Sequence, residues 1–219
     1  MVEVTDDILN KEIEEAKKTV EVLYCSYAEF IEYIKELPSP CREEFAFKDK
    51  DRKTSNQFVI SDHYVGMSHF DTVSPYDSFI WIRKKSDDKR INNNTIIETL
   101  FHELGHQRDH QLYFSKKEDL CFNSLFWGNL FKYRFWKIGM AWHYSVISEV
   151  IAYHYSLKMM EIRGYKEAII SFMISVCKKS SKDKNKYPYY DAGKFFMKTK
   201  LWERCWEKYK KEIESELEK

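Results

Sequence analysis

The segment IIETLFHELGH occupies residues 96–106 and ends in the pentapeptide HELGH. On an α-helix, residues four apart are turned by about 400° and raised by about 6 Å, so His102 and His106 share one face. Two imidazole nitrogens placed in this way can bind one Zn²⁺ at about 2.0–2.1 Å. Glu103 lies beside that face, where a carboxylate can take a proton from a metal-bound water. The segment therefore predicts a zinc site with a neighbouring general base. The alternative is an amphipathic helix whose two histidines are ordinary core or surface residues.

The residues around the pentapeptide favour a helix. Residues 92–95 supply N-cap candidates, and a helical pattern continues to about Leu112. Gly105 in mid-helix costs about 1 kcal/mol relative to alanine. That cost is easier to explain if another element packs close to the helix at this point, so we expect such a contact.

A catalytic zinc has three protein ligands and an open fourth position, so a further ligand is required. His110 continues the four-residue spacing, but it stands about 12 Å along the axis from His102, and an unbroken helix cannot bring both to one ion. We expect His110 to be structural or at the rim of a cleft. Asp109 lies two turns from His102 and is either a hydrogen-bond acceptor behind a ligand or a surface charge.

Glu149 is the better candidate for the third ligand. It lies in a second predicted helix that runs from about Trp142 to Arg163 and is stopped by Gly164. Its neighbours in sequence are largely aliphatic, and a carboxylate among them faces a desolvation cost unless it is paired or bound to a metal. The alternative places Glu149 on a polar stripe with two serines, Ser145 and Ser148. Further rivals for the ligand role are His63, His69, His143 and His154.

HELGH followed by Glu149 on a later helix resembles the gluzincin branch of the zincin metallopeptidases. The 42 residues between His106 and Glu149, and the run EVIAY that starts at Glu149, are most similar to the anthrax lethal-factor and Pro-Pro endopeptidase group. The resemblance covers roughly residues 75–160. It implies Zn²⁺ bound by His102, His106 and Glu149, with Glu103 as general base and proton shuttle in peptide-bond hydrolysis.

The oxyanion-stabilising residue departs from that group's pattern. In the group a tyrosine seven residues before the ligand glutamate assists the oxyanion, and this position is Trp142 in the present chain. His143 and Tyr144 follow immediately. A shift of one or two residues would restore the role, so His143 and Tyr144 are the candidates for it.

Short β-rich segments precede the metal helix. They are 58–60, 64–67 and 79–82. In zincins a sheet edge beside the metal holds the substrate backbone extended, and we expect one of these strands to do so. The alternative is an ordinary hairpin of a small sheet. His63, His69 and Asp71 lie in the same region, but their spacing matches no metal-site template strongly.

Composition sets the remaining expectations. The 219 residues carry 36 basic and 35 acidic side chains, a net charge of +1 that gives no case for nucleic-acid binding. Five cysteines without a Cys-x-x-Cys pair indicate reduced thiols and a cytoplasmic protein, although secretion stays open if a leader has been removed. No run approaches the roughly 18 apolar residues of a membrane span.

The expected fold is a mainly helical α+β, zincin-like single domain. It has an N-terminal helix within residues 1–40, from a cap at Thr5 to about Leu37, a small sheet and the metal helix over 55–112, and a helical part over 113–219 that carries the third ligand. Within the last part we expect an aromatic-rich stretch over 121–140 that forms core or a pocket wall, a helix over 165–178, a solvated loop over 178–186 and a final helix over about 190–218.

The predicted function is that of a zinc-dependent endopeptidase acting on a peptide or protein substrate, with the oligomeric state left open. Two alternatives remain: a noncatalytic sensor or protein-binding module that retains a zincin fold, and a helical protein with no metal at all. The presence of Glu103 argues against a pure binder, because a binder has no use for a base at that position.

Overall fold

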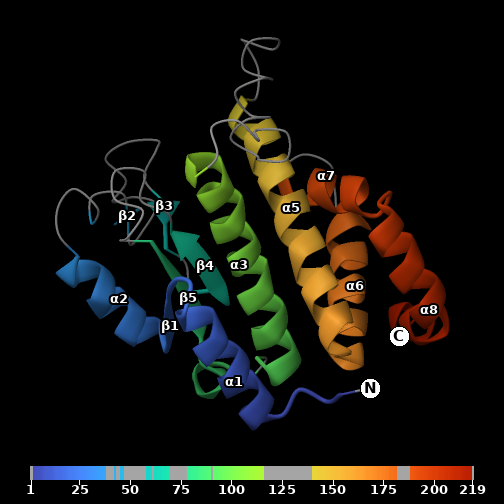
Figure 1. Ribbon diagram of the computed structural model, residues 1–219, viewed down its shortest axis with the longest axis horizontal. Coiled ribbons are helices and arrows are strands. Elements are labelled where there is room, and N and C mark those ends of the chain that lie inside the picture. The colour runs from blue at the N-terminus through green and yellow to red at the C-terminus, as the bar shows by residue number, and fades with distance from the viewer. Residues whose placement is uncertain are drawn as a thin grey trace.

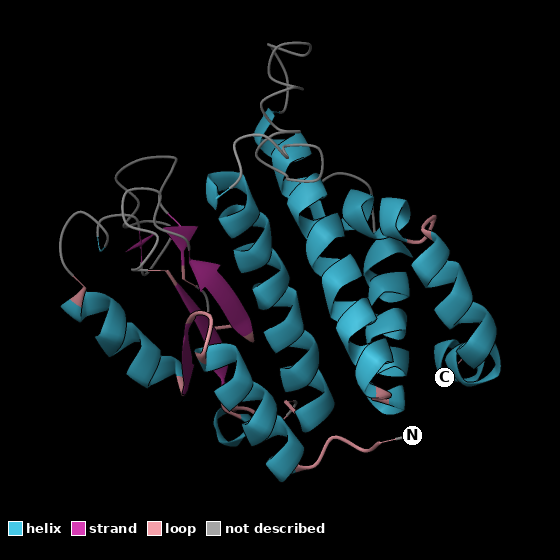
Figure 2. Ribbon diagram, in the orientation of Figure 1, coloured by secondary structure: helices cyan, strands magenta, loops and turns pink. Residues whose placement is uncertain are grey.

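The structure is a computed structural model that describes residues 2–37, 42, 45–46, 58–60, 62–69, 78–89, 91–115, 140–181 and 188–218. Within these residues the chain is a mainly helical α+β protein (Figures 1 and 2). In chain order the elements are α1 (Asp6–Lys17), β1 (Glu21–Cys25), α2 (Tyr27–Glu36), β2 (Phe45–Ala46), β3 (Phe58–Val59), β4 (Gly66–His69), β5 (Phe79–Arg83), the 3₁₀ turn η4 (Lys85–Asp87), α3 (Asn93–Ser115), α5 (Met140–Arg163), α6 (Lys166–Ser181), α7 (Pro188–Phe196) and α8 (Lys200–Leu217).

The main sheet has the strand order β1-β5-β4, with β5 parallel to β1 and antiparallel to β4. Its central strand is buried on both faces, as expected for the predicted apolar run at 79–82. On one face, Trp81 stacks on Phe30 of α2 with ring centroids 4.3 Å apart. On the other face, Ile80 and Ile82 join the core formed with α1 and α3. A strand covered on both faces needs this continuous apolar sequence.

Helix α3 lies between the main sheet and helix α5 (Figure 1). One side of α3 contacts β4 and β5, and the other side packs along α5. Beyond α5, helices α6, α7 and α8 complete the helical part of the molecule (Figure 2). The expectation that a small sheet packs against the helix that carries HELGH is confirmed.

The expected single helix from Thr5 to Leu37 is wrong. The structure has α1, then strand β1, then α2. Apolar residues recur at helical spacing through the whole region, and this periodicity conceals the strand. The missed signals are local: valines at 20 and 22 favour extended backbone, and Ser26 forms a capping box with Glu29 that starts a new helix. The predicted cap at Thr5 is confirmed, since its side chain accepts from the backbone N–H of Ile8.

The expected single C-terminal helix is also wrong, because α7 ends at Phe196 and α8 begins at Lys200. Thr199 caps α8 by accepting from the backbone N–H of Trp202. A threonine followed by helical spacing predicts such a start, and it was overlooked inside a longer periodic pattern. Elsewhere the expected helix over 165–178 is present as α6, three residues longer at its end. Its extension to Ser181 replaces the start of the loop expected over 178–186. The rest of that loop and the aromatic stretch over 121–139 lie outside the described residues.

Candidate metal centre

Helix α3 is started and anchored by local sequence. The Asn92 side chain accepts from the backbone N–H of Thr95 at 3.0 Å, which places the N-cap where the sequence predicted it. In the next two turns, Ile96, Ile97 and Leu100 are fully buried. Burial of these side chains fixes which face of α3 points into the core. The HELGH residues continue the same α-helix, so their orientation is fixed as well.

Gly105 allows α5 to approach α3 closely. A Cβ at this position would lie 2.8 Å from the Cα of Ala152 and 3.1 Å from the Cβ of Tyr155. The expected close contact at Gly105 is therefore confirmed, and α5 is the element that makes it. The same contact brings Glu149, one turn before Tyr153 on α5, to the HELGH face of α3.

His102, His106 and Glu149 converge on one point. The two imidazole Nε2 atoms are 3.2 Å apart. Glu149 Oε2 lies 3.2 Å from Nε2 of His102, and its Oε1 lies 3.5 Å from Nε2 of His106. These three residues form the ligand group: each offers one ligand atom, and these atoms all lie within 4.8 Å of one another. These are the three residues that the sequence proposed as metal ligands, and the structure brings them together.

The spacing of these atoms fits a zinc ion. A tetrahedral ion with bonds of about 2.0–2.1 Å separates neighbouring ligand atoms by about 3.3–3.4 Å, close to the separations found here. Glu149 Oε2 is buried and accepts no well-aligned hydrogen bond, although His102 is within ion-pair distance. A buried carboxylate oxygen without such a bond is costly, and a cation at this point would satisfy it. Two nitrogens and one carboxylate oxygen are a donor set that zinc accepts.

The charges of the group are strongly coupled. Burial alone would raise the pKa of Glu149, but its close polar contacts with His102 and His106 hold this pKa well below its usual range. Burial opposes protonation of His106, but its contacts with the Glu149 carboxylate outweigh this and raise the pKa of His106 to about 9. The Glu149 carboxylate and the protonated His106 ring therefore stabilise each other. A metal bound by His106 would have to replace a proton of this ring, because only a nitrogen with a free lone pair is a ligand.

Glu103 occupies a different environment from Glu149. It is buried beside the ligand group, and burial raises its pKa, an effect that the nearby histidines oppose. Its carboxylate accepts a hydrogen bond from the backbone N–H of Ser68, on strand β4. A raised pKa suits a carboxylate that takes up and releases a proton near neutral pH.

Gln107 holds the sheet against the metal helix. Its side-chain amide donates to Oγ of Ser68 at 2.8 Å and to the backbone carbonyls of His69 and Phe79. β4 is the terminal strand of the main sheet in the described part of the chain. The backbone N–H of Ser68 binds Glu103. This N–H therefore points away from β5, to the side of β4 where no other described strand pairs. Glu103 and Gln107 thus fix this sheet edge beside the ligand group.

The two histidines are supported in different ways. Ser148, the residue before Glu149, places its Oγ 2.8 Å from Nδ1 of His106. The ring of His102 instead packs on Tyr153, with centroids 5.2 Å apart. The polar stripe considered as the alternative for Glu149 is real in part, but it is buried: Ser148 is 6% exposed and Glu149 is 9% exposed. Ser148 and Glu149 therefore face α3 and not solvent.

The other candidates whose side chains the structure describes do not join the ligand group. His63 is an exposed residue near Asp62, and His154 is exposed on α5. His69 is buried between the rings of Phe45 and Phe79. Asp109 is buried near His106 and contributes to its raised pKa, in line with a position behind the ligand.

Some expectations fall outside the described residues. His143 and Tyr144 lie on α5 by their backbone, and His110 lies on α3, but their side chains are not among the described ones. Asp71 is not described at all. Sequence reasoning did not assign roles to Ser68 or Gln107. Neither residue carries a sequence signal of its role, because each role depends on the contact between β4 and α3.

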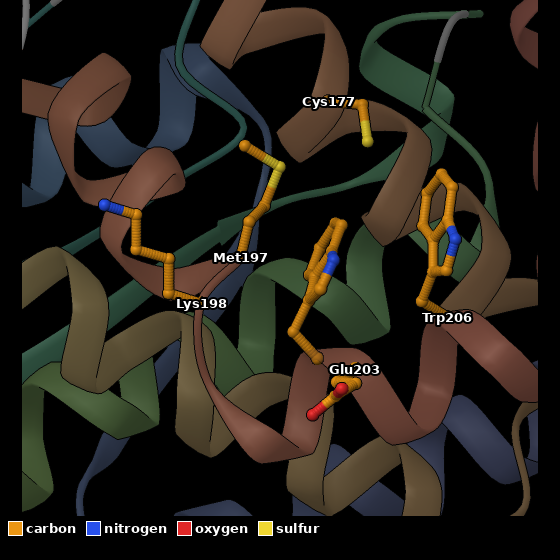
Figure 3. Close-up of a pocket in the computed structure, with 6 residues that line it drawn as sticks. Cys177, Met197, Lys198, Glu203 and Trp206 are labelled. Atoms are coloured by element: carbon orange, nitrogen blue, oxygen red, sulfur yellow. The ribbon is translucent and has the colours of Figure 1, made fainter.

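A pocket of about 460 Å³ lies in the C-terminal helical part (Figure 3). Its lining side chains come from α6, the α7–α8 connection and α8: Cys177, Met197, Lys198, Trp202, Glu203 and Trp206. Trp202 and Trp206 stack with their centroids 6.1 Å apart. The pocket shares no residue with the ligand group, so the two features are separate.

Comparisons with protein-family models, with curated proteins and with solved structures found no match to this chain. Among the described helices, none combines the length and apolar character that crossing a membrane requires.

Proposed function

We propose that this chain is a zinc-dependent metallopeptidase with a zincin-like fold, which binds Zn²⁺ through His102, His106 and Glu149. The observation that carries the proposal is the convergence of the three ligand atoms at tetrahedral spacing, beside a buried glutamate that is not part of the group. When bound, Zn²⁺ would lower the pKa of a coordinated water toward about 7 and polarise a substrate carbonyl.

Glu103 is the general base in this proposal. Its carboxylate lies next to His102 in sequence and is held by the Ser68 N–H, so its position is fixed before substrate arrives. It takes the proton of the attacking water, retains it in a buried site where its pKa is raised, and releases it to the leaving amine. His143 and Tyr144 remain the proposed oxyanion-stabilising residues.

The edge of β4 is the proposed binding surface for an extended peptide. Strand addition at a sheet edge aligns a peptide through backbone hydrogen bonds. Gln107, the residue directly after His106, ties this edge to α3. A peptide or protein substrate placed there would lie beside Glu103.

The test is Glu103→Gln in the purified, zinc-loaded chain. We expect zinc content to be unchanged while cleavage of a peptide library, followed by mass spectrometry, falls by at least about 100-fold. The control is Glu161→Gln on α5, which alters an ion pair with Arg204 far along the helix and should keep both zinc and activity. Full activity in Glu103→Gln would refute the role of this residue.

A wild-type chain that binds zinc but cleaves no peptide would favour the alternative, a noncatalytic module that retains the metal site. A wild-type chain that takes up no zinc would refute the metal centre itself. Elemental analysis separates these two results before any variant is made.

A further inference from the structure

The two proposed zinc ligands on α3, His102 and His106, differ in the contacts that their rings make on the side away from the proposed metal position. His102 packs its ring on the buried ring of Tyr153, and its other contacts are with His106 and Glu149. His106 has a hydrogen-bond partner for its second nitrogen, the hydroxyl of Ser148 at 2.8 Å. Ser148 is 6% exposed, so water competes little for this bond. Among the described side chains, a hydrogen bond therefore reaches Nδ1 of His106, and none is found for the corresponding nitrogen of His102.

We propose that Ser148 is the positioning residue that sets the tautomer and ring orientation of His106 for the metal. The inference rests on the zinc site proposed above and adds a residue that does not touch the ion. Ser148 acts by accepting the Nδ1–H of His106.

In a neutral imidazole, one ring nitrogen carries a hydrogen and the other carries a free lone pair. Only the nitrogen with the lone pair can bind a metal. His106 Nε2 is the atom that faces His102 and Glu149, so the proton must be on Nδ1. Ser148 Oγ stabilises that tautomer as the acceptor of Nδ1–H. Without it, the proton is free to occupy Nε2, where it blocks the metal position.

Ser148 directly precedes Glu149 in the sequence, and the two side chains contact different nitrogens of His106. Consecutive helical residues are turned by about 100°, so Ser148 and Glu149 reach His106 from two directions. Ser148 contacts Nδ1, and Glu149 approaches Nε2. One turn of α5 therefore supplies a ligand and the group that orients another ligand.

Ser156 offers a matched comparison on the same pair of helices. It is also a buried serine of α5, and its Oγ donates to the backbone carbonyl of Glu98 on α3 at 3.1 Å. Ser156 thus joins the two helices without contacting a ligand. A merely structural role for Ser148 predicts that Ser148→Ala and Ser156→Ala behave alike.

The experiment measures zinc affinity of the full chain by competition with a chromogenic chelator, together with thermal unfolding of the metal-free protein. We expect Ser148→Ala to weaken zinc binding by about 10–100-fold. Ser156→Ala should keep wild-type affinity, even though both variants lose one hydrogen bond between α3 and α5 and have similarly lowered Tm values. Equal zinc affinity in wild type and Ser148→Ala would overturn the inference and leave the metal centre standing.

A second measurement does not depend on how well the variant folds. Long-range ¹H–¹⁵N spectra of the zinc-loaded wild type should show the proton of His106 on Nδ1, in slow exchange with solvent. A proton on Nε2 would overturn the inference. A wild-type chain that takes up no zinc would overturn the proposed function, and this inference with it.

Discussion

The helix pair α3 and α5 and the aromatic cluster beside it are both buried, but they are built from different side chains. Of the nine buried polar residues in the described part of the chain, six lie on these two helices: Glu103, Gln107, Asp109, Ser148, Glu149 and Ser156. The aromatic cluster consists of Phe172, Phe196, Trp202 and Trp206, whose rings contact one another in series. Phe172 and Phe196 also contact the ring of Tyr153 on α5, where the cluster meets the helix pair.

This difference separates stability from chemistry. Each buried polar group costs about 1–3 kcal/mol if it is left unpaired, so concentrating such groups on two helices needs a compensating role. Buried aromatic rings instead stabilise the fold without chemical reactivity. Substitutions in the helix pair should therefore change metal binding, and substitutions in the aromatic cluster should change the free energy of unfolding.

The largest effect on metal binding is expected from Glu149→Ala, which removes a ligand. Zinc content should fall from equimolar to background. This is a greater loss than the weakening of zinc affinity by about 10–100-fold expected for Ser148→Ala, because Ser148 only orients a ligand. Elemental analysis after dialysis measures it. Glu161→Ala removes another carboxylate from α5 and should leave zinc content unchanged. Unchanged zinc stoichiometry in Glu149→Ala would reject this residue as a ligand.

The largest effect on stability is expected from Phe196→Ala in the aromatic cluster. Phe196 is fully buried, with ring contacts to Tyr153, Phe172 and Trp202. Its truncation should lower the free energy of unfolding by about 3–5 kcal/mol. Its neighbour Phe195 is 58% exposed and is the matched control, with an expected change within about 0.5 kcal/mol. Urea unfolding decides the comparison; equal losses in the two variants would contradict it.

A substitution at the α3–α5 contact should affect both properties. Gly105→Ala places a methyl group 2.8 Å from the Ala152 backbone, and we expect overpacking to cost about 1–3 kcal/mol despite the better helix propensity of alanine. The helices must separate, so zinc affinity should fall as well. Gly164→Ala is the control: this glycine has a φ of 72° and open space around it, so its replacement strains the backbone without moving α5 toward or away from α3. A stable Gly105→Ala variant with wild-type zinc affinity would show that the helices do not need this approach.

The smallest effect concerns Cys205, a buried thiol of α8. Burial raises its pKa to about 11, and the nearby Glu161 carboxylate acts in the same direction. The unfolded chain releases this proton at about pH 8.5, whereas the folded chain retains it. The resulting stabilisation is complete below about pH 8.5 and is lost as the pH rises toward about 11. Between about pH 8 and pH 10.5, wild type should therefore lose more stability in urea than Cys205→Ala does. Identical losses would show that this thiol does not titrate differently on folding.

Much of the metal helix was predictable because its signals are local. Asn92 caps it, HELGH supplies the ligand face, and Gly105 predicts a close neighbour. Glu149 was predictable because a carboxylate among aliphatic residues needs a partner. The two wrong helices share one cause: apolar spacing continued across a real boundary, and the short capping signals at Ser26 and Thr199 were outweighed by it.

The roles of Ser68, Gln107 and Ser148 were not predictable from the sequence. Each depends on contact between elements far apart in the chain: β4 with α3, and α3 with α5. A serine or a glutamine has no sequence pattern that distinguishes a buried hydrogen bond from a solvated one. Only the packing of the three elements places these groups against Glu103 and His106.

Two close contacts, at Gly66 of β4 and at Gly105 of α3, restrict where this chain can gain or lose residues. A Cβ on Gly66 would collide with Thr99 of α3, and one on Gly105 would collide with α5. Helix α3 is therefore clamped by backbone on both flanks. An inserted or deleted residue within it would turn the HELGH face by about 100° and push ordinary side chains into those flanks. Changes in length between β5 and the pentapeptide are thus tolerable only ahead of Asn92, in the connection that begins after Arg83.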